Sequence, residues 1–407
     1  MKREWSKYFG PGPLIAAAFI GPGTVTVCTL AGVNFGYDLL WALGLSIITT
    51  IILQESAARI GLVTQLGLIP NIHRTIQKAG LRYFSIFLVL MAIVLGNAAY
   101  EAGNISGGSL GAELFFDLGS IRFLQLEINL MNLSIGIIAL FLLYSGSYKL
   151  ITRALTFLVI LMSMAFLLSA MMVRPSVLDL IKGMVPTIKT DNILTIVALI
   201  GTTVVPYNLF LHSSLVIEKW KSIKDLKFVR FDTFLSVVLG GVVSMAIVIA
   251  GAAGSALEVS SASDLAKGLE PLMGSMAKYF IGFGLFAAGI TSAVTAPLAG
   301  SLVITGCFGW TSNISGKPMR WSIGLILGLG LIFASLGIRP VQLITIAQLA
   351  NGILLPLLSG YVIWLVNKKS IMGEFKNTIF MNVLSLMVWL ITLLLGVLSV
   401  MKVLGLL

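Results

Sequence analysis

The sequence predicts an all-α membrane protein, and three observations predict it. Hydrophobic residues make up 57% of the 407-residue chain and charged residues 11%, whereas soluble domains carry about 25% charged residues. Uncharged runs over 39–53, 234–257 and 377–400 approach or reach the roughly 20 apolar residues that a helix needs to cross a bilayer. These runs are apolar on all faces and lack the alternation typical of outer-membrane barrel strands. The composition therefore excludes a water-soluble globule.

Eleven apolar runs, separated by charges and by Gly/Pro clusters, predict eleven transmembrane helices. The first run is expected to be a retained helix and not a signal peptide, because no Ala-x-Ala cleavage pattern follows it before the next run. Every loop has fewer than twenty residues, so residues 1–407 are expected to form a single transmembrane domain. The predicted spans are 13–33, 39–64, 83–110, 128–145, 151–173, 193–217, 234–257, 277–306, 321–337, 341–366 and 378–403.

The positions of Lys and Arg predict the orientation of these spans. With a cytoplasmic N-terminus, 18 of these residues fall inside and 8 outside, which agrees with the positive-inside rule. We therefore expect a multi-pass protein of the cell (inner) membrane, with its N-terminus cytoplasmic and its C-terminus outside. Basic loops lying against anionic headgroups also explain the net charge of +11, so no nucleic-acid partner is expected. Cys28 and Cys307 lie inside apolar runs, which excludes a disulfide framework or a cysteine metal cluster.

Two predicted spans contain Gly and Pro near their middle. Residues 18–26 read Ala-Phe-Ile-Gly-Pro-Gly-Thr-Val-Thr, and residues 201–208 read Gly-Thr-Thr-Val-Val-Pro-Tyr-Asn. Because proline removes a backbone donor and clashes with the preceding turn, Pro22 and Pro206 are expected to unwind spans one and six within the membrane. An ordinary kink at either proline is the simpler alternative.

The places of the two breaks predict an inverted repeat of five plus five helices. Interrupted spans at corresponding positions of two halves are typical of transporters built in this way. The repeats are expected over about 8–173 and 185–366, and the eleventh helix, over about 378–403, is an addition to them.

Five segments of the chain carry a recognisable pattern: Gly10-Pro11-Gly12, Leu30 to Tyr37, Gln54 to Arg59, Pro206 to Ser214 and Ala347 to Gly352. In this order, and from about residue 8 to residue 400, they resemble the Nramp family of metal-ion transporters. This resemblance implies a leucine-transporter-like fold with eleven helices, and secondary active transport by alternating access.

The resemblance also implies where the substrate binds, and the residues at that place differ from those of typical Nramp proteins. The family's first broken helix carries Asp-Pro-Gly-Asn, whose Asp and Asn hold the metal, whereas residues 21–24 of this chain read Gly-Pro-Gly-Thr. The sixth helix of the family carries Met-Pro-His-Asn, with the Met sulfur on the metal, whereas residues 205–208 read Val-Pro-Tyr-Asn and Thr202 stands at the carbonyl position. Both the carboxylate and the thioether are absent, so no set of metal ligands is expected.

A site with this composition favours an anion. The half-helices that begin after Gly23 and Pro206 should direct unpaired N–H groups and positive dipole ends at it, and hydroxyl and amide donors, including Thr26 and Thr203, surround them. The expected substrate is bicarbonate, and the resemblance to a bicarbonate-associated, divergent branch of the Nramp superfamily implies the same. The expected substrate-binding residues are Gly21, Gly23, Thr24, Thr202, Val205, Tyr207, Asn208 and Gln348.

Uptake of an anion into a negative cell requires a coupled cation, Na⁺ or H⁺, and no other cofactor is expected. The family's acidic pair on the third helix matches Glu101 and Asn104, and its sixth-helix His matches His212. These three residues are the expected coupling or proton path. Two packing alternatives stay open: Glu101 as a neutral hydrogen-bonding carboxyl, and His212 as a packed histidine. Glu55 and Arg59 are four residues apart, which predicts an ion pair along one helix.

Two other functions stay open. A divalent cation transporter for Mg²⁺ or Mn²⁺ would need Glu101, Asn208 and Gln348 close together around a hydrated ion. A membrane sensor that does not transport is the second alternative. An enzyme is not expected, because two histidines and few intramembrane carboxylates cannot form a catalytic set. The protein is expected to be a monomer whose partners are the lipid bilayer and a small ion.

Overall fold

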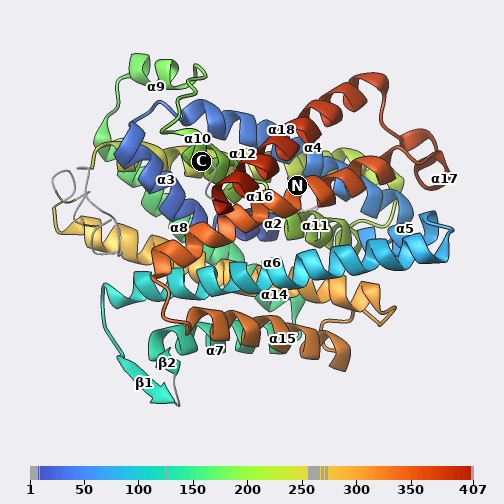
Figure 1. Ribbon diagram of the computed structural model, residues 1–407, viewed down its shortest axis with the longest axis horizontal. Coiled ribbons are helices and arrows are strands. Elements are labelled where there is room, and N and C mark those ends of the chain that lie inside the picture. Colours follow the sequence, from blue (N-terminus) through green and yellow to red (C-terminus); the bar gives the residue numbers. More distant parts are fainter. Residues whose placement is uncertain are drawn as a thin grey trace, which may run out of the picture.

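Helices make up most of the computed structural model, whose longest axis lies horizontally in Figure 1. The structure describes residues 8, 10–123, 126–254, 266, 270 and 274–404, and the backbone alone for residues 122, 123, 126, 127, 340, 345, 348–351 and 403. Its first elements are α2 (Gly12–Phe19), α3 (Pro22–Phe35), α4 (Leu40–Thr64), α5 (Leu68–Thr75), α6 (Ala79–Glu113), β1 (Ser120–Phe123), β2 (Leu126–Asn129), α7 (Leu130–Tyr144), α8 (Tyr148–Val173) and α9 (Val177–Gly183). The later elements are α10 (Ile193–Thr203), α11 (Pro206–Lys219), η1 (Ile223–Asp225), α12 (Leu226–Ala252), α14 (Met276–Cys307), α15 (Lys317–Ala334), α16 (Pro340–Val366), α17 (Lys369–Met372), η2 (Gly373–Phe375) and α18 (Ile379–Val403).

Each of the eleven predicted spans coincides with a helix or with a pair of half-helices. Within the described residues, eight helices are long and apolar enough to cross a membrane, or nine if the bent pair α2 and α3 is one span. Two further apolar stretches, α7 (Leu130–Tyr144) and the part Gly352–Val366 of α16, are shorter. The helical membrane class is therefore confirmed, while the count of eleven and the inverted repeat stay predictions.

The seventh span begins earlier than predicted. α12 starts at Leu226 instead of residue 234, and the predicted end at 255–257 lies outside the described residues. Hydropathy places the charged residues Arg230 and Asp232 outside the span, before its start. The structure keeps them helical because neighbours bind them: Arg230 bonds a carboxylate of α4, and Asp232 accepts backbone N–H groups at the start of α2.

A short antiparallel ribbon between α6 and α7 was not predicted. β1 and β2 pair with Ser120 opposite Asn129, and four-residue strands are too short to produce a recognisable periodicity. The side chain of Asn129 then accepts the N–H groups of Met131 and Asn132 and so caps α7. The ribbon lies at the opposite end of the molecule from α5 and α17 (Figure 1).

α14 lies at the centre of the helices and α8 at their periphery. Buried residues fill 94% of the apolar window of α14 and 28% of that of α8. The peripheral helices expose large apolar side chains such as Phe157, Trp321 and Ile379, as lipid-facing helices do. α6 runs alongside α14 (Figure 1), and a Cβ added to Gly289 would lie 2.2 Å from the Cα of Gly108. The small-residue run of α14 therefore allows close helix packing.

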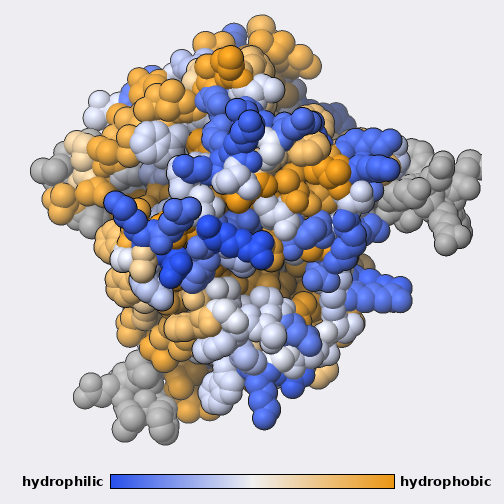
Figure 2. Space-filling model, turned by 90° about the vertical axis from the view of Figure 1, so that its right-hand side faces the viewer, coloured by the Kyte–Doolittle hydropathy of each residue, from blue (hydrophilic) through white to orange (hydrophobic). Residues whose placement is uncertain are grey.

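Many exposed basic side chains share one end of the bundle, which we name the basic end. Figure 2 faces this end and shows hydrophilic residues across its centre. The segments that follow α4, α7, α11, α14 and α16 lie here (Figure 1). The exposed side chains of these segments and of the helix starts beside them include Lys78, Lys149, Lys221, Lys224, Lys317 and Lys369.

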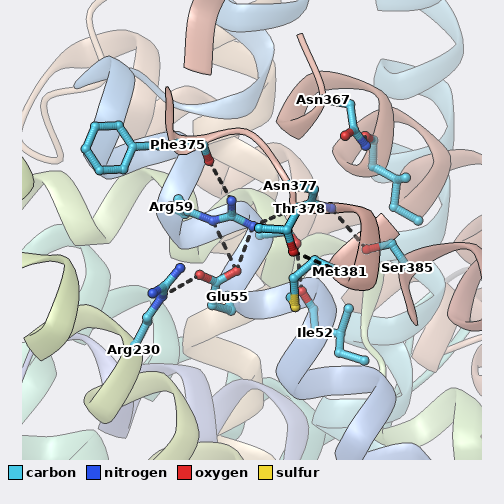
Figure 3. A network of polar contacts seen from close by, with 12 residues as sticks. Ile52, Glu55, Arg59, Arg230, Asn367, Phe375, Asn377, Thr378, Met381 and Ser385 are labelled. Carbon is cyan, nitrogen blue, oxygen red and sulfur yellow. Dashed lines mark hydrogen bonds and ion pairs between the residues drawn. The ribbon is translucent and has the colours of Figure 1, made fainter. Parts of the chain in front are cut away.

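A polar network at the basic end joins α4 to α12 and to the start of α18 (Figure 3). Arg59 Nη2 lies 3.0 Å from Glu55 Oε2, so the predicted ion pair along α4 is confirmed. Arg230 Nε donates to the other carboxylate oxygen at 2.9 Å. Arg59 also donates to Phe375 O and to Asn377 Oδ1, each at 2.6 Å. These long-range partners follow from tertiary packing, and spacing along α4 does not predict them.

Replacing Arg59 is expected to destabilise the protein. Arg59→Met removes a side chain that is 4% exposed and leaves Glu55 and Asn377 without their principal donor, so we expect the free energy of unfolding to fall by about 3 kcal/mol. Thermal unfolding in detergent would measure the loss. The matched control is Arg230→Gln, whose side chain is 55% exposed and whose effect should stay below about 1 kcal/mol. Equal losses in both variants would contradict the central place of Arg59.

Candidate functional site

The first interrupted span breaks between Phe19 and Pro22. α2 ends at Phe19, Gly21 is extended with φ −101° and ψ −178°, and α3 starts at Pro22. The two half-helices are bent by 55°. Because Pro22 has no N–H to donate, the helix cannot continue, and the last carbonyls of α2 lose their partners within the helix. The predicted break in span one is confirmed.

Side chains from three helices bond carbonyls of α2, namely those freed at its end and that of Ile15, which lies within the helix. The donors and acceptors are Thr24 Oγ1 to Phe19 O (2.5 Å), Tyr207 Oη to Ala18 O (3.0 Å), Asn208 Nδ2 to Ile15 O (3.2 Å) and Ser292 Oγ to Ala17 O (3.3 Å). None of the four donor residues is more than 1% exposed. The donors of Tyr207 and Asn208 were expected to face the substrate, and here they bond α2 instead. The reason is that carbonyls freed inside a membrane must find donors within the protein.

The second interrupted span breaks between Thr203 and Pro206, where α10 ends and α11 starts. The hydroxyl of Thr203 donates back to Leu199 O at 3.0 Å and contacts the hydroxyl of Ser46 in α4. Thr202 Oγ1 lies 2.8 Å from Thr24 Oγ1 of the first break. The structure therefore breaks both predicted spans and brings the two breaks together.

α6 passes beside the first break and carries the predicted coupling pair. Asn104 Nδ2 donates to Glu101 Oε2 at 3.2 Å, and these side chains are 2% and 0% exposed. A Cβ added to Gly21 would lie 2.5 Å from Ser292 Oγ and 3.7 Å from Asn104 Oδ1. The hydrogen-bonded pair of Glu101 and Asn104 therefore lies beside the break at Gly21.

Three oxygens in this region are buried without a hydrogen-bond partner among the described residues: Asn208 Oδ1, Glu101 Oε1 and Thr26 Oγ1. Such atoms are uncommon because each forfeits its hydrogen bonds to water, and here they are acceptor positions available to a ligand or a proton. Within the part of the chain that the structure describes, no three His, Cys, Asp or Glu side chains lie close enough to hold a metal ion.

His212 lies apart from the two breaks. Its Nδ1 is 2.9 Å from Gln54 Oε1 of α4, and both side chains are buried. Its Nε2 has no partner in the described residues. No contact joins His212 to Glu101 or Asn104 there, so the structure brings together two of the three predicted coupling residues. Gln348 belongs to α16, and its side chain lies outside the described part.

Two residues of this site were not singled out from the sequence. Ser292 lies in a run of small residues of α14, and its hydroxyl bonds α2 beside Gly21. Gln54 belongs to a segment quoted for family resemblance, yet it is the partner of His212. The available signal in the sequence is a hydroxyl or amide side chain on a helix other than the broken ones. Such a residue can be assigned to the site only after the helices are placed in three dimensions.

The chemistry of the two breaks is that of neutral dipoles. Gly23, Thr24 and Tyr207 stand in the first turns of α3 and α11, where backbone N–H groups have no acceptor one turn back within the helix. The positive ends of both helix dipoles lie here as well. The carbonyls at the end of α2, by contrast, already accept side-chain donors. The breaks therefore offer N–H donors to a ligand, beside the oxygens of Asn208 and Thr26 that have no partner in the described residues.

Comparison with known proteins gives a consistent assignment. The family model described as natural resistance-associated macrophage protein-like (Nramp) matches residues 12–402. The chain is 26% identical to the natural resistance-associated macrophage protein 2 homolog of Dictyostelium discoideum, over 92% of this chain and 60% of that protein. It is 25% identical to the divalent metal cation transporter MntH of Staphylococcus saprophyticus, over 97% of this chain and 90% of that protein.

Solved structures share the fold. A crystal structure of the Eremococcus coleocola manganese transporter, in complex with an aromatic bis-isothiourea substituted compound, matches with a TM-score of 0.80 and 20% identity, over 97% of this chain and 86% of that one. Mhp1, a nucleobase-cation-symport-1 family transporter in a closed conformation, matches with a TM-score of 0.58 and 14% identity, over 97% and 92% of the two chains. At these identities the likeness establishes the fold alone.

Proposed function

The chain belongs to the Nramp family of membrane transporters, and from that premise we propose that it is a secondary active transporter of a small anion, with bicarbonate as the preferred substrate. The observation that carries the proposal is the neutral lining of the two facing breaks. Gly21 and Val205 stand where a carboxylate and a thioether would be needed for a soft divalent metal. A dehydrated divalent ion at membrane depth without a counter-charge costs several kcal/mol.

Hydrogen-bonding capacity supports an anion at the same place. The carbonyls of Ile15, Ala17 and Ala18 already accept donors, which weakens them as cation ligands. N–H groups in the first turns of α3 and α11 remain as donors to an oxyanion. Bicarbonate also has one hydroxyl donor, and Asn208 Oδ1 is a buried acceptor without a partner in the described residues. This complementarity favours bicarbonate over anions that only accept hydrogen bonds.

Transport of a divalent cation such as Mn²⁺ or Mg²⁺ is the second candidate. The specific observation in its favour is the naming of relatives: the staphylococcal protein is called a divalent metal cation transporter and the Eremococcus protein a manganese transporter. The oxygens of Glu101, Asn104 and Asn208 would then act on a hydrated ion. The lack of a charged group at the breaks themselves is the reason we place this candidate second.

We assign coupling to a proton carried by Glu101, with Na⁺ bound near the breaks as the alternative. Glu101 Oε1 is buried without a hydrogen-bond partner in the described residues, and its second oxygen reaches Asn104 beside Gly21. Taking up a proton would remove the cost of an uncompensated charge at this depth. A cytoplasmic basic end, and hence a cytoplasmic N-terminus, is part of the proposal and rests on the positive-inside rule.

Uptake into liposomes tests the proposal. Purified protein would be assayed for labelled bicarbonate under an inward proton gradient, an inward Na⁺ gradient and no gradient, beside Mn²⁺ and Mg²⁺. Protein-free liposomes under the same gradients are the control, since dissolved CO₂ crosses membranes unaided. Saturable bicarbonate uptake above this control supports an anion transporter. Saturable Mn²⁺ or Mg²⁺ uptake with no bicarbonate uptake would reverse the order of the two candidates.

A further inference from the structure

The Gly10-Pro11-Gly12 segment at the start of α2 has no part in the ion site, yet a carboxylate binds it closely. Asp232 of α12 accepts the N–H of Gly10 on Oδ1 at 3.0 Å and the N–H of Gly12 on Oδ2 at 2.9 Å. Pro11 between them has no N–H, so each carboxylate oxygen bonds one of the two flanking N–H groups. Asp232 is 2% exposed, and its charge lies at the positive end of the α2 dipole.

The two glycines are required for this contact. A Cβ on Gly12 would lie 2.0 Å from Ser236 Oγ and 2.6 Å from Asp232 Oδ1. A Cβ on Gly10 would lie 2.1 Å from the ring of Trp220 at the end of α11. The start of α2 therefore fits against α11 and α12 only because these positions have no side chain.

The first turns of α12 contact two other parts of the molecule: one face contacts the segment at the start of α2, and a residue off that face binds α4. The Tyr8 ring meets Phe228 and Phe231 edge-on, with centroids 4.7 and 5.5 Å apart. Phe228, Phe231 and Asp232 are spaced i, i+3 and i+4, which places them on one face. Arg230, off this face, binds Glu55. The start of α12 thus anchors α2 and is itself fixed to α4.

α2 connects this anchor with the ion site. The helix has eight residues, about 12 Å at 1.5 Å per residue. Its far end carries the carbonyls that Tyr207 and Ser292 bond, and the 55° bend follows. A cavity of about 590 Å³ is lined by residues of α8, α11 and α14, among them Tyr148, Ser214 and Leu302, and by the segments that follow α4 and α14. α2 packs against the same three helices, so a movement of α2 would act on helices that line the cavity.

We propose that Asp232 is a positioning residue whose contact with Gly10 and Gly12, here named the latch, holds α2 in the position that closes the ion site. Opening of the ion site toward the basic end requires the carboxylate to release both glycines. The proposal rests on the proposed transport by alternating access. Ending the contact frees α2 to turn about the break at Gly21, which uncovers the route from the breaks to the cavity. Asp232 does not touch the substrate.

Cysteine accessibility tests the latch without any substrate. In a protein with Cys28→Ser and Cys307→Ser, the fully buried Ala17 of α2 would be replaced by Ala17→Cys as reporter. Labelling by a membrane-impermeant maleimide from the basic end would then be timed. We expect Asp232→Ala to accelerate labelling at least tenfold and Asp232→Asn, which keeps one acceptor, to accelerate it less. Gly12→Ala keeps Asp232 but adds a methyl group where its carboxylate lies. Labelling of this variant should be accelerated as much as labelling of Asp232→Ala.

Control variants separate release of the latch from general loosening. Asp225→Asn removes a half-buried carboxylate from the start of the same helix, and its labelling should stay within about twofold of the starting protein. Unchanged labelling in both Asp232→Ala and Gly12→Ala, or equal acceleration in Asp225→Asn, would overturn the proposal. Where wild-type flux is measurable, Asp232→Ala should also raise the KM for substrate offered at the opposite end at least fivefold. Labelling needs no substrate, so failure of the proposed transport and failure of the latch give different results.

Discussion

Gly21→Asp is expected to reduce the initial rate of bicarbonate uptake at least tenfold. The new carboxylate would enter the cluster formed by Ser292 Oγ and Asn104 Oδ1, which lie 2.5 and 3.7 Å from the Cβ position. A negative charge there repels an anion across a few ångströms of low dielectric, an interaction of several kcal/mol at an effective dielectric constant of about 20. It would also mask the positive end of the α3 dipole. Uptake of labelled bicarbonate into liposomes under one fixed gradient measures the effect.

Gly21→Asn is the matched control, because its side chain has the shape of aspartate without the charge. Both variants force Ser292 to move, so the difference between them isolates electrostatics from crowding. We expect Gly21→Asn to retain several times more uptake than Gly21→Asp. If the two variants transport equally, the anion does not bind at this break. If Gly21→Asp gains Mn²⁺ uptake while losing bicarbonate uptake, the charge at residue 21 selects the sign of the substrate.

The sequence was sufficient for the helices and for the two breaks. Apolar runs locate membrane helices because a backbone in lipid must bond within its own segment. Pro22 and Pro206 locate the interruptions because proline removes a donor wherever the helix lies. The pair Glu55 and Arg59 follows from spacing on one helix. Each of these inferences depends on local covalent or periodic constraints, and each agrees with the structure.

The roles of the site's donors were not predictable in the same way. The sequence identifies Tyr207 and Asn208 as polar residues beside a break, but it does not tell which acceptor their donors find. The structure directs both at carbonyls of α2, and Ser292, from a helix far along the chain, does the same. Asp232 was likewise interpreted as lying before its span, because hydropathy cannot distinguish a solvated charge from one that binds a helix N-terminus.

Glu101→Gln is expected to abolish the acceleration of uptake by an inward proton gradient. Glutamine keeps the shape and the contact with Asn104 Nδ2 at 3.2 Å, but it cannot bind and release a proton. The ratio of bicarbonate uptake with the gradient to uptake without it should fall from several-fold to about one. Exchange of labelled for unlabelled bicarbonate, which needs no net proton movement, should persist because Glu101 lies on α6 and not at the facing breaks. Both assays use the same liposomes, after subtraction of protein-free controls.

Glu113→Gln is the control for this prediction, since it makes the same change on the same helix. Glu113 is the last residue of α6, twelve residues after Glu101, and accepts bonds from Ser109 and Asn129, so its loss should leave the dependence on the proton gradient intact. A Glu101→Gln protein that still responds to the proton gradient would exclude Glu101 as the carrier. A wild-type protein that responds to Na⁺ alone would do the same, and the coupling cation would then be sought at the oxygens of the breaks. If exchange also ceases in Glu101→Gln, the carboxyl is required for binding or for the conformational change as well as for coupling.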